Sequence, residues 1–194
     1  MICYLIRHGK DDETVRGGWS RHPLTTEGIK QAETLAKAFA GNRTIDCIYS
    51  SDLPRAMQTA EKIAKEVDLS VIPLPLFRET NNGELAGIKN DIALVRYPGL
   101  FWNQMGWEQH YPNGESPKQF YERISTAWAD FSQRIISQNK NVVLVTHGGV
   151  IHVILSIIEG HKYNNAEKQR PVAHGEIIAL AYEHKSWFEL EHTL

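Results

Sequence analysis

Residues 1–10 read MICYLIRHGK, a short apolar run that ends abruptly at Arg7, His8 and Gly9. The apolar part, residues 2–6, has the length and composition of a strand buried on both faces. It is too short for a signal peptide or a membrane span, and no other stretch reaches about eighteen apolar residues. The stretch therefore predicts a buried strand that carries an arginine and a histidine at its carboxyl end.

The rest of the chain alternates apolar runs with stretches of helical period and contains no linker or repeat. Strands are expected at 2–7, 45–50, 69–74 and 141–146, with two more within 175–192 joined by a tight turn near His184 and Lys185. Helices are expected at about 24–40, 53–67, 89–97, 116–138 and 149–158. Such alternation predicts a three-layer α/β/α fold, with a mainly parallel sheet and helices on both of its faces.

Local signals mark where three of these helices begin. Thr25 is expected to cap the first helix and Asp52 the second, while Ser116 and Gln119 form a capping box around Pro117. The residues expected to form the buried face of the first helix are Ile29, Ala32, Leu35, Ala36 and Phe39.

Two of the expected strands end in a histidine followed by glycine. Arg7 and His8 end the first strand, and His147 follows the strand at 141–146. Because ligands bind beyond the carboxyl ends of parallel strands, both histidines are expected at one edge of the sheet. Arg55 falls in the first turn of the helix at 53–67, where the helix N-terminus and a guanidinium together favour a phosphate group.

Composition limits the kinds of partner. The 194 residues carry a net charge of −2 with 42% hydrophobic residues, which fits one globular domain and argues against a nucleic-acid-binding protein. The two cysteines, Cys3 and Cys47, fall in expected strands and are interpreted as reduced apolar residues. With no targeting or membrane segment recognised, a cytoplasmic location is expected.

Six motifs follow one another in a familiar order: LIRHGK, GWSRHPLTTEGIKQA, SSDLPRAMQTA, FRETNNGELAG, PNGES and VLVTHGGVI. Together they resemble the histidine phosphatase superfamily, the phosphoglycerate mutase-like fold, in its RHG-motif phosphatase branch. The resemblance covers nearly the whole chain apart from much of 89–111.

The resemblance implies roles for individual residues. His8 corresponds to the nucleophile that becomes phosphorylated, Arg7, Arg55 and His147 to the phosphate pocket, and Glu79 to the general acid and base. No metal or other cofactor is implied. The ring of His8 is expected to be held by a hydrogen bond from its second nitrogen to a backbone carbonyl. His174 is expected at the pocket rim.

This chain departs from the family pattern around the pocket mouth. Lys10 stands where Glu or Gln is common, and the loop at 11–18 is short and lacks a phosphate-binding asparagine, for which Thr14 or Arg16 could substitute. Arg21 replaces a usual aspartate, and Ala86 a frequent glutamate. Lys10, Arg16, Arg21 and His22 could bind a second anionic group of the substrate; alternatively, Lys10 pairs with Asp11 or Asp12.

The chain is interpreted as a single domain, 1–194, with an active-site lid at about 81–115. The lid is rich in aromatic residues, which either recognise a ring-bearing substrate or form the core of the lid itself. They are Tyr97, Phe101, Trp102, Trp107 and Tyr111.

The sequence favours a metal-independent phosphomonoesterase that hydrolyses a small phosphorylated metabolite through a phosphohistidine. A phosphoglycerate mutase-type transfer is the main alternative, followed by a non-catalytic phospholigand-binding module and a metal-dependent hydrolase. No HExxH motif or similar ligand cluster supports the last. Neither a nucleic acid nor a membrane is expected as partner, and a homodimer is left open.

Overall fold

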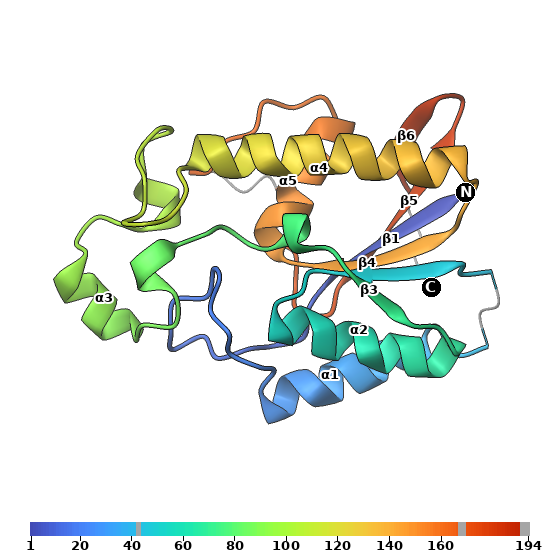
Figure 1. The fold of residues 1–194 in the computed structure, drawn as a ribbon, viewed down its shortest axis with the longest axis horizontal. Helices are drawn as coiled ribbons and strands as arrows, with labels where there is room; N and C mark the ends of the chain where they lie inside the picture. The colour runs from blue at the N-terminus through green and yellow to red at the C-terminus, as the bar shows by residue number, and fades with distance from the viewer. Residues whose placement is uncertain (42–43, 167–169, 191–194) are drawn as a thin grey trace.

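The computed structural model describes residues 1–41, 44–166 and 170–190. A six-stranded sheet crosses the molecule in the order β3-β2-β4-β1-β5-β6 (Figure 1). The strands are β1 (Ile2–Arg7), β2 (Cys47–Ser50), β3 (Val71–Pro73), β4 (Val142–Thr146), β5 (Ile177–Glu183) and β6 (Ser186–Glu189). β1 to β4 are parallel, and β5 and β6 extend the sheet antiparallel at one edge. The predicted fold class is confirmed.

Helices cover both faces of the sheet. They are α1 (Thr26–Lys37), α2 (Pro54–Val67), α3 (Asn90–Arg96), α4 (Pro117–Ser137) and α5 (Gly148–Ile158). Figure 1 shows α1 and α2 on one side of the sheet and α4 and α5 on the other. Short 3₁₀ turns lie at Pro75–Phe77, Gly83–Leu85 and Trp102–Gln104. None of the helices in the described ranges is long and apolar enough to span a membrane.

β1 shows why the sheet needs two helical layers. Its alternate side chains Cys3 and Leu5 pack into the cluster formed with α4 and α5, whereas Tyr4 and Ile6 pack into the cluster formed with α1 and α2. Successive strand residues point to opposite faces, so a wholly apolar strand must be covered twice.

Two expected helix caps and the expected turn between the last two strands are found. Thr25 caps α1 by accepting a hydrogen bond from the Gly28 N–H, and Ser116 and Gln119 form the capping box of α4. The tight turn between β5 and β6 is formed by His184 and Lys185, both with positive φ.

Two local predictions are wrong. Asp52 does not cap α2, which starts after Leu53 without a side-chain cap, because the Asp52 carboxylate is bound by Arg78 instead. Ile29 is 37% exposed rather than buried, since the core-facing side of α1 is already filled by Ala32, Leu35 and Ala36.

Candidate active site

The ends of β1 and β4 bring two histidines together. Arg7 is paired with Thr146 across the two strands, and the His8 N–H donates to the Thr146 carbonyl over 3.0 Å. One residue beyond, the rings of His8 and His147 lie with centroids 5.0 Å apart. Both side chains are buried. Parallel register therefore places the two predicted histidines side by side.

His8 is held as a neutral base with a defined tautomer. Its Nδ1 lies 2.7 Å from the Gly9 carbonyl, which can only accept, and its Nε2 accepts from Arg55 Nε at 3.2 Å. The proton is thus on Nδ1 and the lone pair on Nε2, and the predicted hydrogen bond from the ring to a backbone carbonyl is present. Burial, followed by the charge of Arg55, holds the pKa of His8 well below its usual value.

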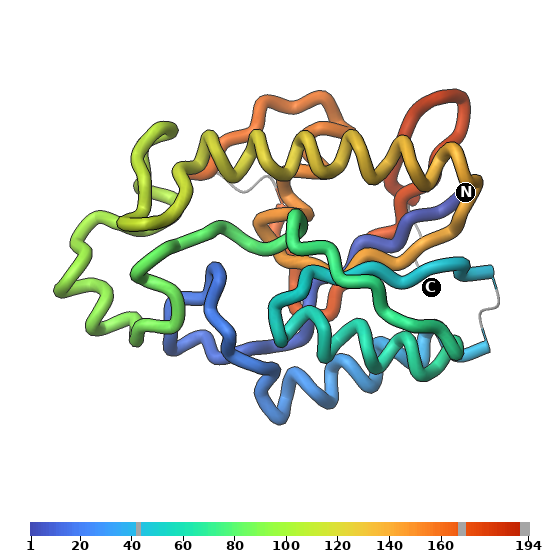
Figure 2. The backbone as a smooth tube through the Cα atoms, viewed as in Figure 1, coloured from blue at the N-terminus to red at the C-terminus, as the bar shows by residue number. Residues whose placement is uncertain are grey.

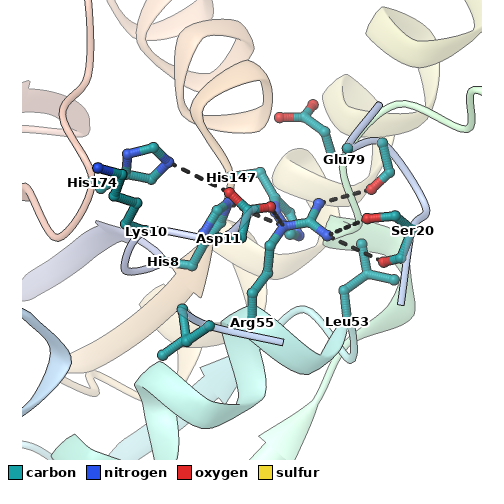
Figure 3. A network of polar contacts seen from close by, with 12 residues as sticks. His8, Lys10, Asp11, Ser20, Leu53, Arg55, Glu79, His147 and His174 are labelled. Carbon is teal, nitrogen blue, oxygen red and sulfur yellow. Dashed lines mark hydrogen bonds and ion pairs between the residues drawn. The ribbon is translucent and has the colours of Figure 1, made fainter. Parts of the chain in front are cut away.

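Arg55 is buried although it is charged, because backbone carbonyls surround its guanidinium. Nη2 donates to the Gly18 carbonyl at 2.7 Å and Nη1 to the Ser20 carbonyl at 3.2 Å (Figure 3). One turn along α2, the Thr59 hydroxyl accepts from the Gly9 N–H at 3.0 Å. The first turn of α2 and the loop after β1 therefore fix Arg55 against His8.

Arg7 and His147 each keep one buried nitrogen unpaired. Arg7 donates to the Val172 carbonyl and to His174 Nε2, at 2.6 and 2.7 Å, while His147 Nε2 is hydrogen-bonded to the Ser51 hydroxyl at 2.8 Å. Among the described residues, Arg7 Nε and His147 Nδ1 have no partner. Buried polar atoms are nearly always satisfied, so these two atoms mark a place for a ligand.

The side chain of Glu79 contacts the N-terminus of α5. Its Oε2 accepts from the Gly149 N–H at 3.1 Å, and its Oε1 accepts from the Thr80 N–H at 3.1 Å. Figure 3 shows its carboxylate across the pocket from His8 and Arg55. Pairing with Arg78, the simplest structural role for this residue, does not occur, because Arg78 binds Asp52.

A cavity of about 250 Å³ opens beside Glu79. Arg16 reaches its wall, with the guanidinium 4.3 Å above the centre of the Phe101 ring. Figure 2 shows the loop after β1 lying beside the loop before α3, where the Arg16 N–H donates to the Ile88 carbonyl at 2.8 Å. The lining residues are Arg16, Gly17, Gly18, Glu79, Thr80, Asn82, Trp102, Tyr111, Gly148, Gly149, His152 and Asn165.

Other basic residues predicted at the mouth lie elsewhere. Lys10 pairs with Glu27 at 2.7 Å, not with Asp11 or Asp12. Arg21 is exposed and, with His22, borders a separate open depression. The residue before it, Ser20, contacts Arg55 through its backbone carbonyl. Thr14 is exposed and donates to Asp12. Of the candidates for a second anionic group, the structure brings only Arg16 to the cavity.

His174 and Asp11 complete the pocket. The ring of His174 lies 5.5 Å from that of His8, and burial followed by Arg7 lowers its pKa. Asp11, which the sequence suggested only as a partner of Lys10, places its Oδ2 atom 3.3 Å from Arg55 Nε. The sequence could have pointed to Asp11 in one way. It is an acidic residue only three positions after His8, in a loop that is expected to bind phosphate.

The atoms of His8, Asp11 and His174 lie close enough to hold a metal ion. Arg55 Nε, however, already donates to His8 and faces Asp11, and Arg7 donates to His174. Two guanidinium groups repel a cation, so this cluster fits an anion pocket better than a metal centre.

Aromatic residues of the segment at about 81–115 pack against one another and also border the cavity. Tyr111 and Met105 form a small core with Leu85, and Trp102 stacks on Tyr111. Trp102 and Tyr111 also line the cavity beside Glu79. A larger depression of about 830 Å³, at Trp107 and Met105, lies next to this cavity and shares Asn165 with it.

Comparison with known proteins agrees with this arrangement. The chain is 30% identical over 171 residues to the 2,3-bisphosphoglycerate-dependent phosphoglycerate mutase of Bartonella bacilliformis, covering 80% of each chain. It is also 30% identical over 162 residues to the uncharacterized phosphatase PhoE of Bacillus subtilis, covering 82% of this chain and 77% of that protein. The crystal structure of the alpha-ribazole phosphatase from Shigella flexneri superposes with a TM-score of 0.83 at 25% identity, covering 98% of this chain and 95% of that one.

A family model, the histidine phosphatase superfamily (branch 1), matches residues 3–193. The match spans both strand-end histidines, Arg55 and Glu79. The motifs, the fold and the relatives agree, and the chain belongs to the histidine phosphatase superfamily, branch 1.

Proposed function

We propose that this protein is a metal-independent phosphomonoesterase that hydrolyses a small phosphorylated metabolite through a phosphohistidine on His8. One observation carries the proposal: a neutral, buried His8 directs its Nε2 lone pair at the guanidinium that would hold the phosphoryl group. Two further buried nitrogens, Arg7 Nε and His147 Nδ1, have no partner among the described residues.

In the first step a phosphoryl oxygen takes over the hydrogen bond from Arg55 Nε, and the freed lone pair of His8 Nε2 attacks phosphorus. The N–P bond forms and the ester P–O bond breaks. Charge spreads over three equatorial oxygens, which Arg7, Arg55 and His147 can stabilise together. The lowered pKa of His8 supports this role, because a protonated imidazole has no lone pair for attack.

Glu79 is proposed as the proton donor. It would protonate the departing alkoxide and then, as a carboxylate, take a proton from the water that attacks the phosphohistidine. Its two backbone hydrogen bonds hold the carboxyl group on the wall of the cavity, where the leaving group has room.

Hydrolysis is preferred over a mutase reaction because the cavity of about 250 Å³ suits one small ester. The phosphatase names of two relatives, PhoE and the alpha-ribazole phosphatase, support the same choice. Transfer of the mutase type is the second candidate, favoured by the similarity to the mutase of Bartonella bacilliformis and by Arg16, a cation that could bind a second anionic group. A binding module would need neither a nucleophile nor a proton donor. A cytoplasmic location is part of the proposal.

The test is a panel of phosphorylated metabolites assayed with and without a chelator. Release of inorganic phosphate should be unchanged by the chelator, and His8→Ala should abolish both turnover and an acid-labile phosphoenzyme. His184→Asn, in the exposed turn between β5 and β6, is the matched control. Activity restored only by a divalent ion, or a label on another residue, would refute the mechanism; conversion of phosphoglycerate without phosphate release would identify a mutase.

A further inference from the structure

Asp11 places a carboxylate inside the pocket that the proposed reaction assigns to phosphate. Its Oδ2 lies 3.3 Å from Arg55 Nε and its Oδ1 lies 3.7 Å from His174 Nε2. The side chain is only 13% exposed. Figure 3 shows Asp11 between His174 and Arg55, in front of the His8 ring. A bridge between the backbones of Asp11 and Leu24 holds the loop in this place.

The same N–H of Arg55 faces both Asp11 and the nucleophile. Arg55 Nε donates to His8 Nε2 at 3.2 Å while Asp11 Oδ2 stands 3.3 Å from it. A phosphorus atom poised for attack must lie about 3–3.5 Å from His8 Nε2. Its oxygens would then reach Arg55 and lie against the Asp11 carboxylate.

The charges around Asp11 do not favour a dianion. Arg55 of α2 and Arg7 of β1 are the cations that face it, and His8 and His174, whose pKa values are lowered, face it as neutral rings. Across the pocket stands a second carboxylate, Glu79. On its own loop, Lys10 is bound by Glu27, and Glu13 is exposed. The Asp11 carboxylate offsets part of the positive charge of Arg7 and Arg55 and repels a ligand with two negative charges.

We propose that Asp11 selects the protonation state of the phosphoryl group, so that ligand and carboxylate share one proton. Either the phosphoryl group binds as a monoanion and donates its O–H to Asp11, or a protonated Asp11 donates to the dianion. Both descriptions hold the same single proton, which is taken up from the solvent when the dianion binds, and no bond to phosphorus is made or broken. The inference rests on the proposed function in taking phosphate as the ligand and His8 as the group that faces its phosphorus atom.

The experiment counts protons taken up when inorganic phosphate binds. Calorimetric titrations in two buffers of different ionisation enthalpy, at about pH 8 where phosphate is largely a dianion, give the number directly. Wild-type protein should take up about one proton per phosphate, and its affinity should fall about tenfold per pH unit above that pH. Asp11→Asn and the smaller Asp11→Ser should take up almost none and should bind phosphate more tightly at this pH.

Asp12→Asn is the matched control, because it removes the same charge one residue away. Asp12 accepts from the Thr14 hydroxyl at 2.6 Å, and the variant should behave as wild type. Thermal unfolding of each variant checks that it is folded.

Three results would overturn the inference: no phosphate binding by wild-type protein, no proton uptake by wild-type protein, or unchanged proton uptake in both Asp11 variants. The last result would assign the proton to a histidine. Ester turnover is measured separately. Turnover without proton uptake would refute this inference and support the proposed function. Proton uptake without turnover would support this inference and refute the proposed function.

Discussion

A methyl group on Gly149 would overlap Glu79 Oε1, closer than non-bonded carbon and oxygen atoms approach. The neighbouring Gly148 differs, because a methyl group there would meet Arg7 Nε at 3.5 Å, an ordinary contact distance. The two glycines after His147 therefore have separate roles. Gly149 makes room for the proposed proton donor, and Gly148 lies against an arginine of the pocket.

Gly149→Ala should displace Glu79 and lower kcat/KM for an alkyl phosphate by about a hundredfold or more, the usual contribution of a general acid. Gly148→Ala should lose much less. Both positions are in the first turn of α5, where alanine is favoured over glycine by up to about 1 kcal/mol. Urea unfolding should therefore show no loss of stability in Gly148→Ala. Equal activity in the two variants would mean that Glu79 does not need its present position.

Glu79→Gln should slow reaction chiefly with poor leaving groups. An alkyl phosphate leaves as a strongly basic alkoxide and needs a proton, while nitrophenolate needs little help, so the burst rate should fall about a hundredfold to ten-thousandfold only for the alkyl ester. Breakdown of the phosphoenzyme should slow for both, because glutamine cannot take a proton from water.

The measurement for Glu79→Gln compares burst and steady-state rates for the two esters. Glu61→Gln, on the exposed surface of α2, is the control. An equal loss of burst rate with both esters would assign Glu79 a role in binding or structure and leave the proton donor unidentified.

Folding stability should decline as pH falls below about 6.5, the ordinary pKa of an unfolded histidine. Burial, with Arg55 next, holds the pKa of His147 well below that value, and the same two causes act on His8. At lower pH these histidines are protonated in the unfolded chain but not in the folded protein. Their contribution to the free energy of unfolding is therefore complete above about pH 6.5 and decreases as the pH falls below that value.

Urea unfolding of wild type and His147→Gln at a series of pH values tests this. Replacing one such histidine should reduce the slope of unfolding free energy against pH by roughly 1 kcal/mol per pH unit below about 6.5. The variant should be less stable at neutral pH, where the hydrogen bond to Ser51 is lost. Identical slopes in the two proteins would show that folding does not lower the pKa of His147.

Much of the fold follows from local patterns in the sequence. A run such as 142–145 is apolar at every position, which requires cover on both faces, and strand–helix alternation then leads to a parallel sheet. The location of His8, Arg55 and His147 also follows, since each directly follows a strand or opens a helix, and parallel topology gathers such positions at one edge. The capping signals of α1 and α4 succeed for the same local reason.

Tertiary structure alone decided which charges meet. Lys10 binds Glu27 and Asp52 binds Arg78, contacts that join residues distant in sequence and depend on how loops fold back on the sheet. Asp11 is the clearest case: its place beside Arg55 depends on the path of the short loop after β1 and its bridge to Leu24. Period and propensity describe the backbone of single elements, whereas a long side chain finds its partner only after the layers have packed.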